Sequence, residues 1–134
     1  MSVVIIDRVG SLLTKLTQLS VDLQRTLSVI RRELTITEKR ALNFKRILEI
    51  LPTEELRQKL QDVDFKDKFY IDPSPVQLLE ILKRAESDCE AFTKQILKTI
   101  DKLREIERSY GSDVVLLVII HRDGTLITPL SILT

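Results

Sequence analysis

The stretch VVLLVIIHRDGTLITPLSILT, residues 114–134, decides the fold of this chain, because its apolar start has to be covered by something. The run from Val114 to Ile120 is uncharged and rich in β-branched residues, which is typical of a strand that is buried on both faces. Seven residues are too few to cross a bilayer. Other parts of the chain must therefore cover at least one face of this strand.

We predict a β-hairpin over residues 114–133. Asp123 and Gly124 form the preferred central pair of a type I′ turn, in which both central residues need a positive φ. A turn at this pair places Ile120 opposite Ile127.

A long helix is predicted upstream, over residues 9–51. Between Leu13 and Leu51, ten of the twelve seam positions of six heptads are apolar, which is a strong helix pattern. Thr35 followed by Glu38 fits a capping box. A break of this helix near residue 35 therefore stays open.

A second long helix is predicted over residues 75–110. Ser74 is a suitable N-cap, Pro75 fits the first helical position, and Gln77 completes a capping box. Gly111 is the expected C-terminal stop.

The connector between the long helices contains a short helix and a loop. Thr53 is a suitable N-cap for a helix over residues 53–63. Residues 64–74 break the helical period and are predicted to form a loop. Three aromatic residues of this loop are predicted to close the end of a helical bundle: Phe65, Phe69 and Tyr70.

These elements predict one domain over residues 1–134, mainly α with a small β part (α+β). A helix of about 40 residues spans roughly 60 Å, whereas a compact domain of this size is only about 36 Å across. An antiparallel helical hairpin resolves this conflict and brings the two chain ends together. A strand over residues 1–7 then joins the C-terminal hairpin in a three-stranded antiparallel sheet.

We expect this chain to form homo-oligomers, with a dimer built on a four-helix core favoured over larger assemblies. The helices cover one face of the predicted sheet, and the other face lacks an obvious cover within the chain. An apolar face of this kind marks an interaction surface. The residues predicted to mediate self-association are Val114, Leu116, Val118, Ile120, Leu12 and Leu19.

A basic ridge on the first long helix is the other candidate site. Position f of four consecutive heptads is basic, which gives a ridge about 30 Å long at 10.5 Å per heptad. A nucleic-acid backbone or an acidic protein partner would fit this charge, although solvated surface charge is also common at such positions. The residues at position f are Arg25, Arg32, Lys39 and Arg46, and those flanking them are Arg31, Arg40 and Lys45.

Little in the sequence favours catalysis. The single histidine, His121, stands beside the predicted turn, and the single cysteine, Cys89, stands on an apolar helical stripe. Phosphate-binding loops and metalloprotease motifs are missing. We therefore expect no enzyme activity, cofactor, metal site or small-molecule substrate.

Composition points to a soluble cytoplasmic protein without membrane contact. The net charge is +1, and the sequence has one cysteine and one methionine. Low cysteine and methionine content with many charged and aliphatic residues is typical of heat-adapted proteins.

Two functional hypotheses follow from the sequence. The first is a non-enzymatic structural, assembly or protein-interaction protein that acts as a homo-oligomeric helical bundle. The second is a nucleic-acid-binding protein that uses the basic ridge.

Overall fold

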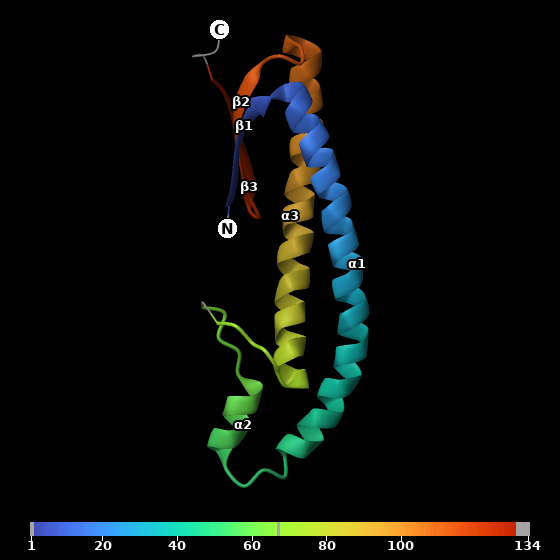
Figure 1. Cartoon of the computed structure of the whole chain (residues 1–134), viewed down its shortest axis with the longest axis vertical. Coiled ribbons are helices and arrows are strands. Elements are labelled where there is room, and N and C mark those ends of the chain that lie inside the picture. The colour runs from blue at the N-terminus through green and yellow to red at the C-terminus, as the bar shows by residue number, and fades with distance from the viewer. Residues whose placement is uncertain (1, 67, 131–134) are drawn as a thin grey trace. The chain divides into compact units, whose positions relative to one another are not determined.

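The computed structural model describes residues 2–66 and 68–130. The chain is mainly helical with one small antiparallel sheet, as predicted (Figure 1). Its elements are β1 (Ser2–Arg8), α1 (Val9–Leu48), α2 (Glu54–Gln61), α3 (Pro75–Tyr110), β2 (Val115–His121) and β3 (Gly124–Pro129). The last residues of the predicted hairpin, 131–133, lie outside the described residues.

Helix α1 runs without a break through Thr35. The Thr35 hydroxyl donates a hydrogen bond to the Arg31 carbonyl oxygen of the same helix, at 3.1 Å. Thr35 is therefore an internal residue of α1 and not an N-cap. The helix ends at Leu48, before the predicted end at residue 51. The next amides bond back three residues, from Leu51 N–H to Leu48 O at 3.2 Å, which tightens the last turn ahead of Pro52.

The start and stop signals of α3 are confirmed. The Gln77 N–H donates to Ser74 Oγ at 3.2 Å, and the Ser74 N–H donates to Gln77 Oε1 at 3.0 Å. These two bonds form the predicted capping box. Gly111 ends the helix with φ of 89°, a backbone conformation that favours glycine.

The chain divides into two compact units. The first, which we call the sheet unit, holds the chain up to Leu27 together with everything from Asp88 onward. The second, which we call the connector unit, comprises Ser28–Ser87. Each unit contains paired segments of α1 and α3.

In the sheet unit, β2 is the central strand between β1 and β3. The N–H of Val9 donates to the Val114 carbonyl at 3.0 Å, and that of Gly10 donates to the Ser112 carbonyl at 3.1 Å. A Cβ on Gly10 would stand 3.4 Å from the Ser112 Cβ, an ordinary van der Waals contact. The predicted meeting of the two terminal parts of the chain is confirmed.

The predicted register of the hairpin is wrong by two residues. His121 pairs with Gly124, and Ile120 pairs with Thr125, so Arg122 and Asp123 are the central residues of the turn. A shift of two residues leaves every side chain on the same face of the sheet. The apolar pattern therefore fits both registers equally well.

Contacts with α3 accompany the observed register. Arg122 forms an ion pair with Asp88 of α3. The Thr99 hydroxyl oxygen lies 3.1 Å from the Thr125 hydroxyl oxygen and 2.7 Å from the Gln95 carbonyl oxygen, and its single hydrogen is shared between these two acceptors. A turn at Asp123 and Gly124 would place different residues opposite these partners.

The inner face of the sheet packs on α1 and α3 to form the core of the sheet unit (Figure 1). Its fully buried members come from all three elements: Val9, Leu12 and Leu16 of α1, Ile96, Ile100 and Leu103 of α3, and Leu116, Val118 and Ile120 of β2.

This core corrects the predicted self-association surface. Of the six residues predicted to mediate self-association, four are buried inside the chain's own core: Leu12, Leu116, Val118 and Ile120. Val114 and Leu19 are partly buried against the same core. The sequence prediction chose the wrong face of β2, because a strand that is apolar on both faces does not reveal which face the helices cover.

In the connector unit, α1 packs on the start of α3. Leu34, Ala41 and Leu48 of α1 share a small core with Val76 and Leu79 of α3. An ion pair between Arg31 Nε and Glu86 Oε2 at 3.2 Å joins the same two helices.

The predicted aromatic plug is wrong. Phe69 is 87% exposed and Phe65 is 53% exposed. The Phe65 ring lies 5.3 Å from the Arg84 guanidinium carbon, a cation–π contact at the surface. The Tyr70 hydroxyl accepts a hydrogen bond from the Asp64 N–H at 3.0 Å.

Candidate interaction surfaces

The first candidate surface is the outer face of the sheet. Strand pairing aligns Val4 with Ile119 and Leu126, and it aligns Ile6 with Leu117. These five apolar residues alternate with the buried residues of the inner face, so they point away from α1 and α3. We call them the outer-face cluster.

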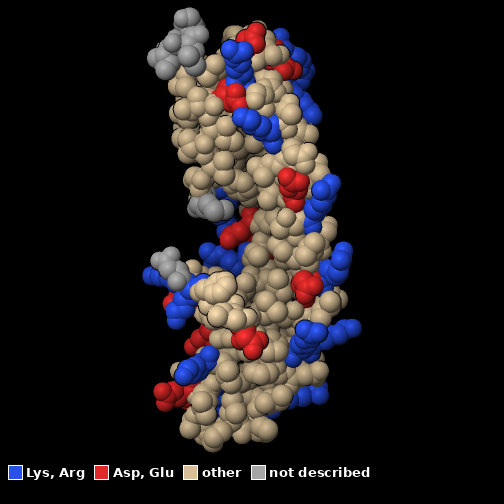
Figure 2. All heavy atoms as spheres, viewed as in Figure 1, with Lys and Arg blue, Asp and Glu red and all other residues tan. Residues whose placement is uncertain are grey.

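The described residues leave this cluster uncovered. Val4 is 62% exposed, Ile6 is 60% exposed and Leu126 is 54% exposed. The helices lie on the other side of the sheet (Figure 1), and the surface over the strands is largely without Lys, Arg, Asp or Glu (Figure 2). The centre of this face is therefore both apolar and neutral.

Among the described residues, the ionisable side chains of this face stand at its ends. Arg8 ends β1, opposite Val115. His121 lies beside the turn, where its Nδ1 accepts a hydrogen bond from the Asp123 N–H at 3.2 Å and lies 3.4 Å from Asp123 Oδ2. The contacts of His121 are with the turn, as a structural role requires.

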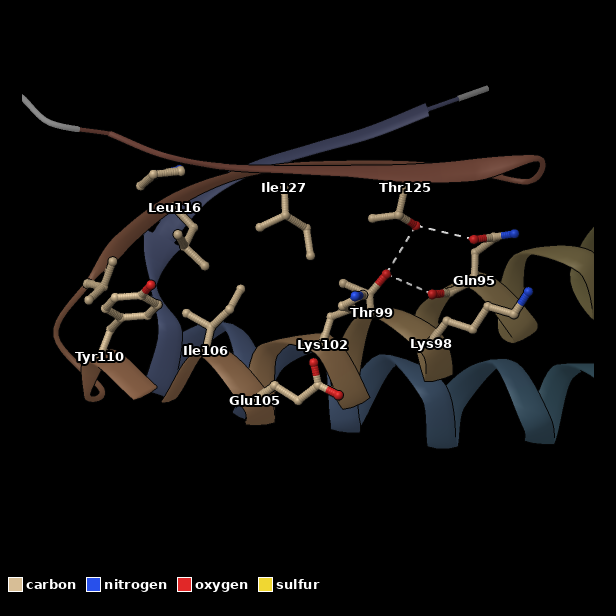
Figure 3. Close-up of a pocket in the computed structure, with 12 residues that line it drawn as sticks. Gln95, Lys98, Thr99, Lys102, Glu105, Ile106, Tyr110, Leu116, Thr125 and Ile127 are labelled. Atoms are coloured by element: carbon tan, nitrogen blue, oxygen red, sulfur yellow. Dashed lines mark hydrogen bonds between the residues drawn. The ribbon is translucent and has the colours of Figure 1, made fainter. Parts of the chain in front are cut away.

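The second candidate surface is a groove between α3 and β3, with a volume of about 850 Å³. Thr125 and Ile127 point from β3 toward α3, and Thr99 and Ile106 point back from α3 (Figure 3). The remaining lining residues are Gln95, Lys98, Lys102, Glu105, Tyr110, Val114, Leu116 and Pro129.

The groove has a polar end and an apolar end. Thr99, Thr125 and Gln95 are linked by hydrogen bonds at the polar end, with Thr125 Oγ1 to Gln95 Oε1 at 3.3 Å (Figure 3). Tyr110 and Leu116 lie at the other end (Figure 3). Sequence analysis missed this groove, because its two walls come from elements that only the fold brings together.

The basic ridge lies on the exposed side of α1, and all seven of its residues are exposed. Arg25 belongs to the sheet unit and the other six belong to the connector unit. Arg31 is committed to its ion pair with Glu86. Among the described residues, no ion pair involves Arg32, Lys39 or Arg46.

Asp7 ties β1 to the first turns of α1. Its carboxylate accepts hydrogen bonds from the Lys15 ammonium, from the Ser11 hydroxyl at 2.6 Å and from the Arg8 N–H at 2.8 Å. These bonds, that of Lys15 first, lower the pKa of Asp7 from 3.8 to about 2. The ionised carboxylate also suits the positive end of the α1 dipole.

The Cys89 thiol is partly buried and donates a hydrogen bond to the Leu23 carbonyl at 3.5 Å, so it is packed in the sheet unit. Over residues 2–66 and 68–130, His, Cys, Asp and Glu side chains form no cluster that could hold a metal ion. Within the same residues, no helix is long and apolar enough to cross a membrane.

Comparison of the chain with protein-family models, with curated proteins and with solved structures finds no match.

Proposed function

We propose that this chain is a non-enzymatic interaction protein that self-associates through the outer-face cluster. The observation that supports this proposal is the exposure of Val4, Ile6 and Leu126, beside half-buried residues of β2, on a sheet whose inner face is packed. Burial of apolar surface is favourable by about 25 cal/mol per Å². The largest apolar patch of a typical monomer covers about 300–600 Å² and is often functional.

A second copy of the chain is the occupant that best fits this face. In a two-fold dimer the same patch meets itself, so a patch with central charges would repel its copy. The centre of this face carries none, and its charged groups, such as Arg8, stand at the ends. A charged partner surface would instead lose its hydration against an apolar face without gaining ion pairs.

The size of the face predicts weak association. Three strands at about 4.8 Å spacing and six residues at about 3.4 Å cover roughly 300 Å². A stable interface uses about 800 Å² from each partner. We therefore expect a dissociation constant of about 10 µM to 1 mM. The four-helix core, which would add area, stays a prediction.

The test is a double substitution on β1, Val4→Glu with Ile6→Glu. Both side chains are mostly exposed on an edge strand, so charge is tolerated there in the monomer. Sedimentation velocity should show the wild-type coefficient rising over about 10 µM to 1 mM. The double variant should remain monomeric over the same range.

A matched control carries the same added charge elsewhere in the sheet unit. Val21→Glu with Leu97→Glu replaces apolar residues of the helices that are 39% and 43% exposed. This control should associate like the wild type. A wild-type chain that stays monomeric, or two double variants that behave alike, would contradict the proposal.

Nucleic-acid binding by the basic ridge is the second candidate function. Arg32, Lys39 and Arg46 favour it, because they are exposed, recur at about 10.5 Å per heptad and form no ion pair among the described residues. Phosphates at similar spacing would bind through charge and counterion release. An acidic protein surface is the other partner that would fit this charge.

Fluorescence anisotropy with a labelled DNA duplex measures the affinity of the chain for DNA. Affinity should fall about tenfold or more between about 50 and 200 mM salt. Arg32→Glu with Lys39→Glu should abolish binding, whereas Arg104→Glu with Arg108→Glu on α3 should reduce it far less. Absence of binding at low salt would leave the ridge without a nucleic-acid role.

A further inference from the structure

The open edge of β3 lies directly beside the groove. β3 is an edge strand of the described sheet. The Leu130 N–H donates to the Val115 carbonyl at 3.0 Å. Hydrogen bonds of an antiparallel ladder alternate along the strand, so the main-chain groups of Thr125 and Ile127 face the open edge.

The same two residues direct their side chains into the groove (Figure 3). A strand added beside β3 would therefore place alternate side chains over the groove, in line with Thr125 and Ile127. The side chains of the added strand that face α3 would contact the apolar part of the groove lining. Tyr110, the last residue of α3 and part of the apolar end of the groove, is 76% exposed.

Three charged side chains line the groove, Lys98, Lys102 and Glu105, and the two lysines give it an excess of positive charge. Lys98 and Lys102 lie one helical turn apart on α3, and both line the groove. In the described part of the chain, neither ammonium group forms an ion pair. With the side-chain amide of Gln95 they make one end of the groove suited to a carboxylate, while Glu105 lies about one turn further along α3.

We propose that this groove binds an extended peptide segment of a partner protein as a fourth strand on β3. The segment runs antiparallel to β3, with apolar residues at alternate positions and an acidic residue near Lys98 and Lys102. Main-chain hydrogen bonds supply affinity and the alternate side chains supply selectivity.

An extended peptide suits the site better than a lipid tail or a helix. An alkyl chain would fill the apolar part but would offer nothing to the outward N–H groups of Thr125 and Ile127. A helix satisfies its own main chain and cannot extend a sheet. The site also differs from the outer-face cluster, because it lies on the helix side of β3.

The probe is a synthetic peptide, acetyl-Thr-Val-Thr-Val-Thr-Glu-Thr-amide. Its valines and glutamate share one face of a strand, and the glutamate follows the valines as the antiparallel direction requires. Titration into ¹⁵N-labelled protein, followed by NMR, should shift the amide signals of Thr125, Ile127 and the neighbouring α3 residues. Saturation is expected below about 1 mM peptide. Absence of saturable shifts overturns the proposal.

Charge reversal tests the role of the lysines. Lys98→Glu with Lys102→Glu should weaken binding about tenfold or more, and a peptide with Lys in place of Glu should prefer this variant. Arg104→Glu with Arg108→Glu, on the same helix but outside the groove lining, should bind the original peptide nearly as well as the wild type. Equal affinities of all variants for both peptides overturn the proposal.

Two further probes separate strand addition from other modes. N-methylation of the second valine removes an N–H that would face β3, and it should abolish binding. Decanoate should not shift the same signals. Undiminished binding of the methylated peptide, or binding of decanoate without binding of the peptide, overturns the fourth-strand proposal.

The Val4→Glu, Ile6→Glu variant should bind the peptide normally, which keeps this result independent of self-association.

Discussion

Val118→Asp is expected to prevent folding of the sheet unit, lowering the free energy of unfolding by about 4 kcal/mol or more. Val118 is fully buried in the central strand, and it pairs with Ile5 and Ile127. A carboxylate there would lose its hydration without gaining a partner. Urea unfolding followed by circular dichroism measures the loss.

The adjacent residue provides the matched control. Ile119 lies on the same strand but in the outer-face cluster, beside Val4 and Leu126. Because Ile119 is half-buried in the central strand, Ile119→Asp should cost about 1–2 kcal/mol of stability, clearly less than Val118→Asp, and should abolish self-association. If Ile119→Asp destabilised the chain as much as Val118→Asp, the assignment of the two faces would be wrong.

Leu103→Ala is expected to lower the free energy of unfolding by about 2–5 kcal/mol. Leu103 is fully buried in the core of the sheet unit, where it packs with Leu16 and Leu116. The substitution removes apolar contacts and leaves a cavity that a close-packed core fills only in part. The midpoint of urea unfolding at unchanged slope reports the effect.

Leu97→Ala on the same helix is the control for this substitution. Its side chain is 43% exposed, so truncation removes few packed contacts and should cost less than about 1 kcal/mol. Similar losses for Leu97→Ala and Leu103→Ala would show that α3 does not face the sheet as described.

The ends of α3 were predictable because their causes are local. Ser74 and Gln77 lie within one turn of each other and satisfy each other's backbone N–H groups. Gly111 takes a positive φ that few other residues adopt. Such signals act over three or four residues, so they can be read from the chain without knowledge of its fold.

The register of the hairpin was not predictable from the same kind of signal. The local preference of Asp123 and Gly124 for a turn favoured one register, and the structure has another. The two registers differ in what meets α3, such as Arg122 with Asp88 and Thr125 with Thr99. These contacts join residues that are more than twenty positions apart in the chain.

The candidate surfaces also differ in how far the sequence alone could predict them. The seven basic residues of the ridge could be named from the sequence, because one helix carries them all and its period is known. The groove could not be named, because Lys98 and Lys102 come from α3 and Ile127 comes from β3. The outer face was expected to lack a cover, but its residues were assigned to the wrong side of β2.

By itself, the sequence determined the existence of the helices, the ends of α3 and the meeting of the terminal strands, because periodicity, capping and chain length act along the backbone. Only the tertiary structure decided which face of β2 is buried, which register the hairpin takes and where the groove opens. A strand that is apolar on both sides has no internal preference between them. The contacts of α1 and α3 with Leu116, Val118 and Ile120 make that choice.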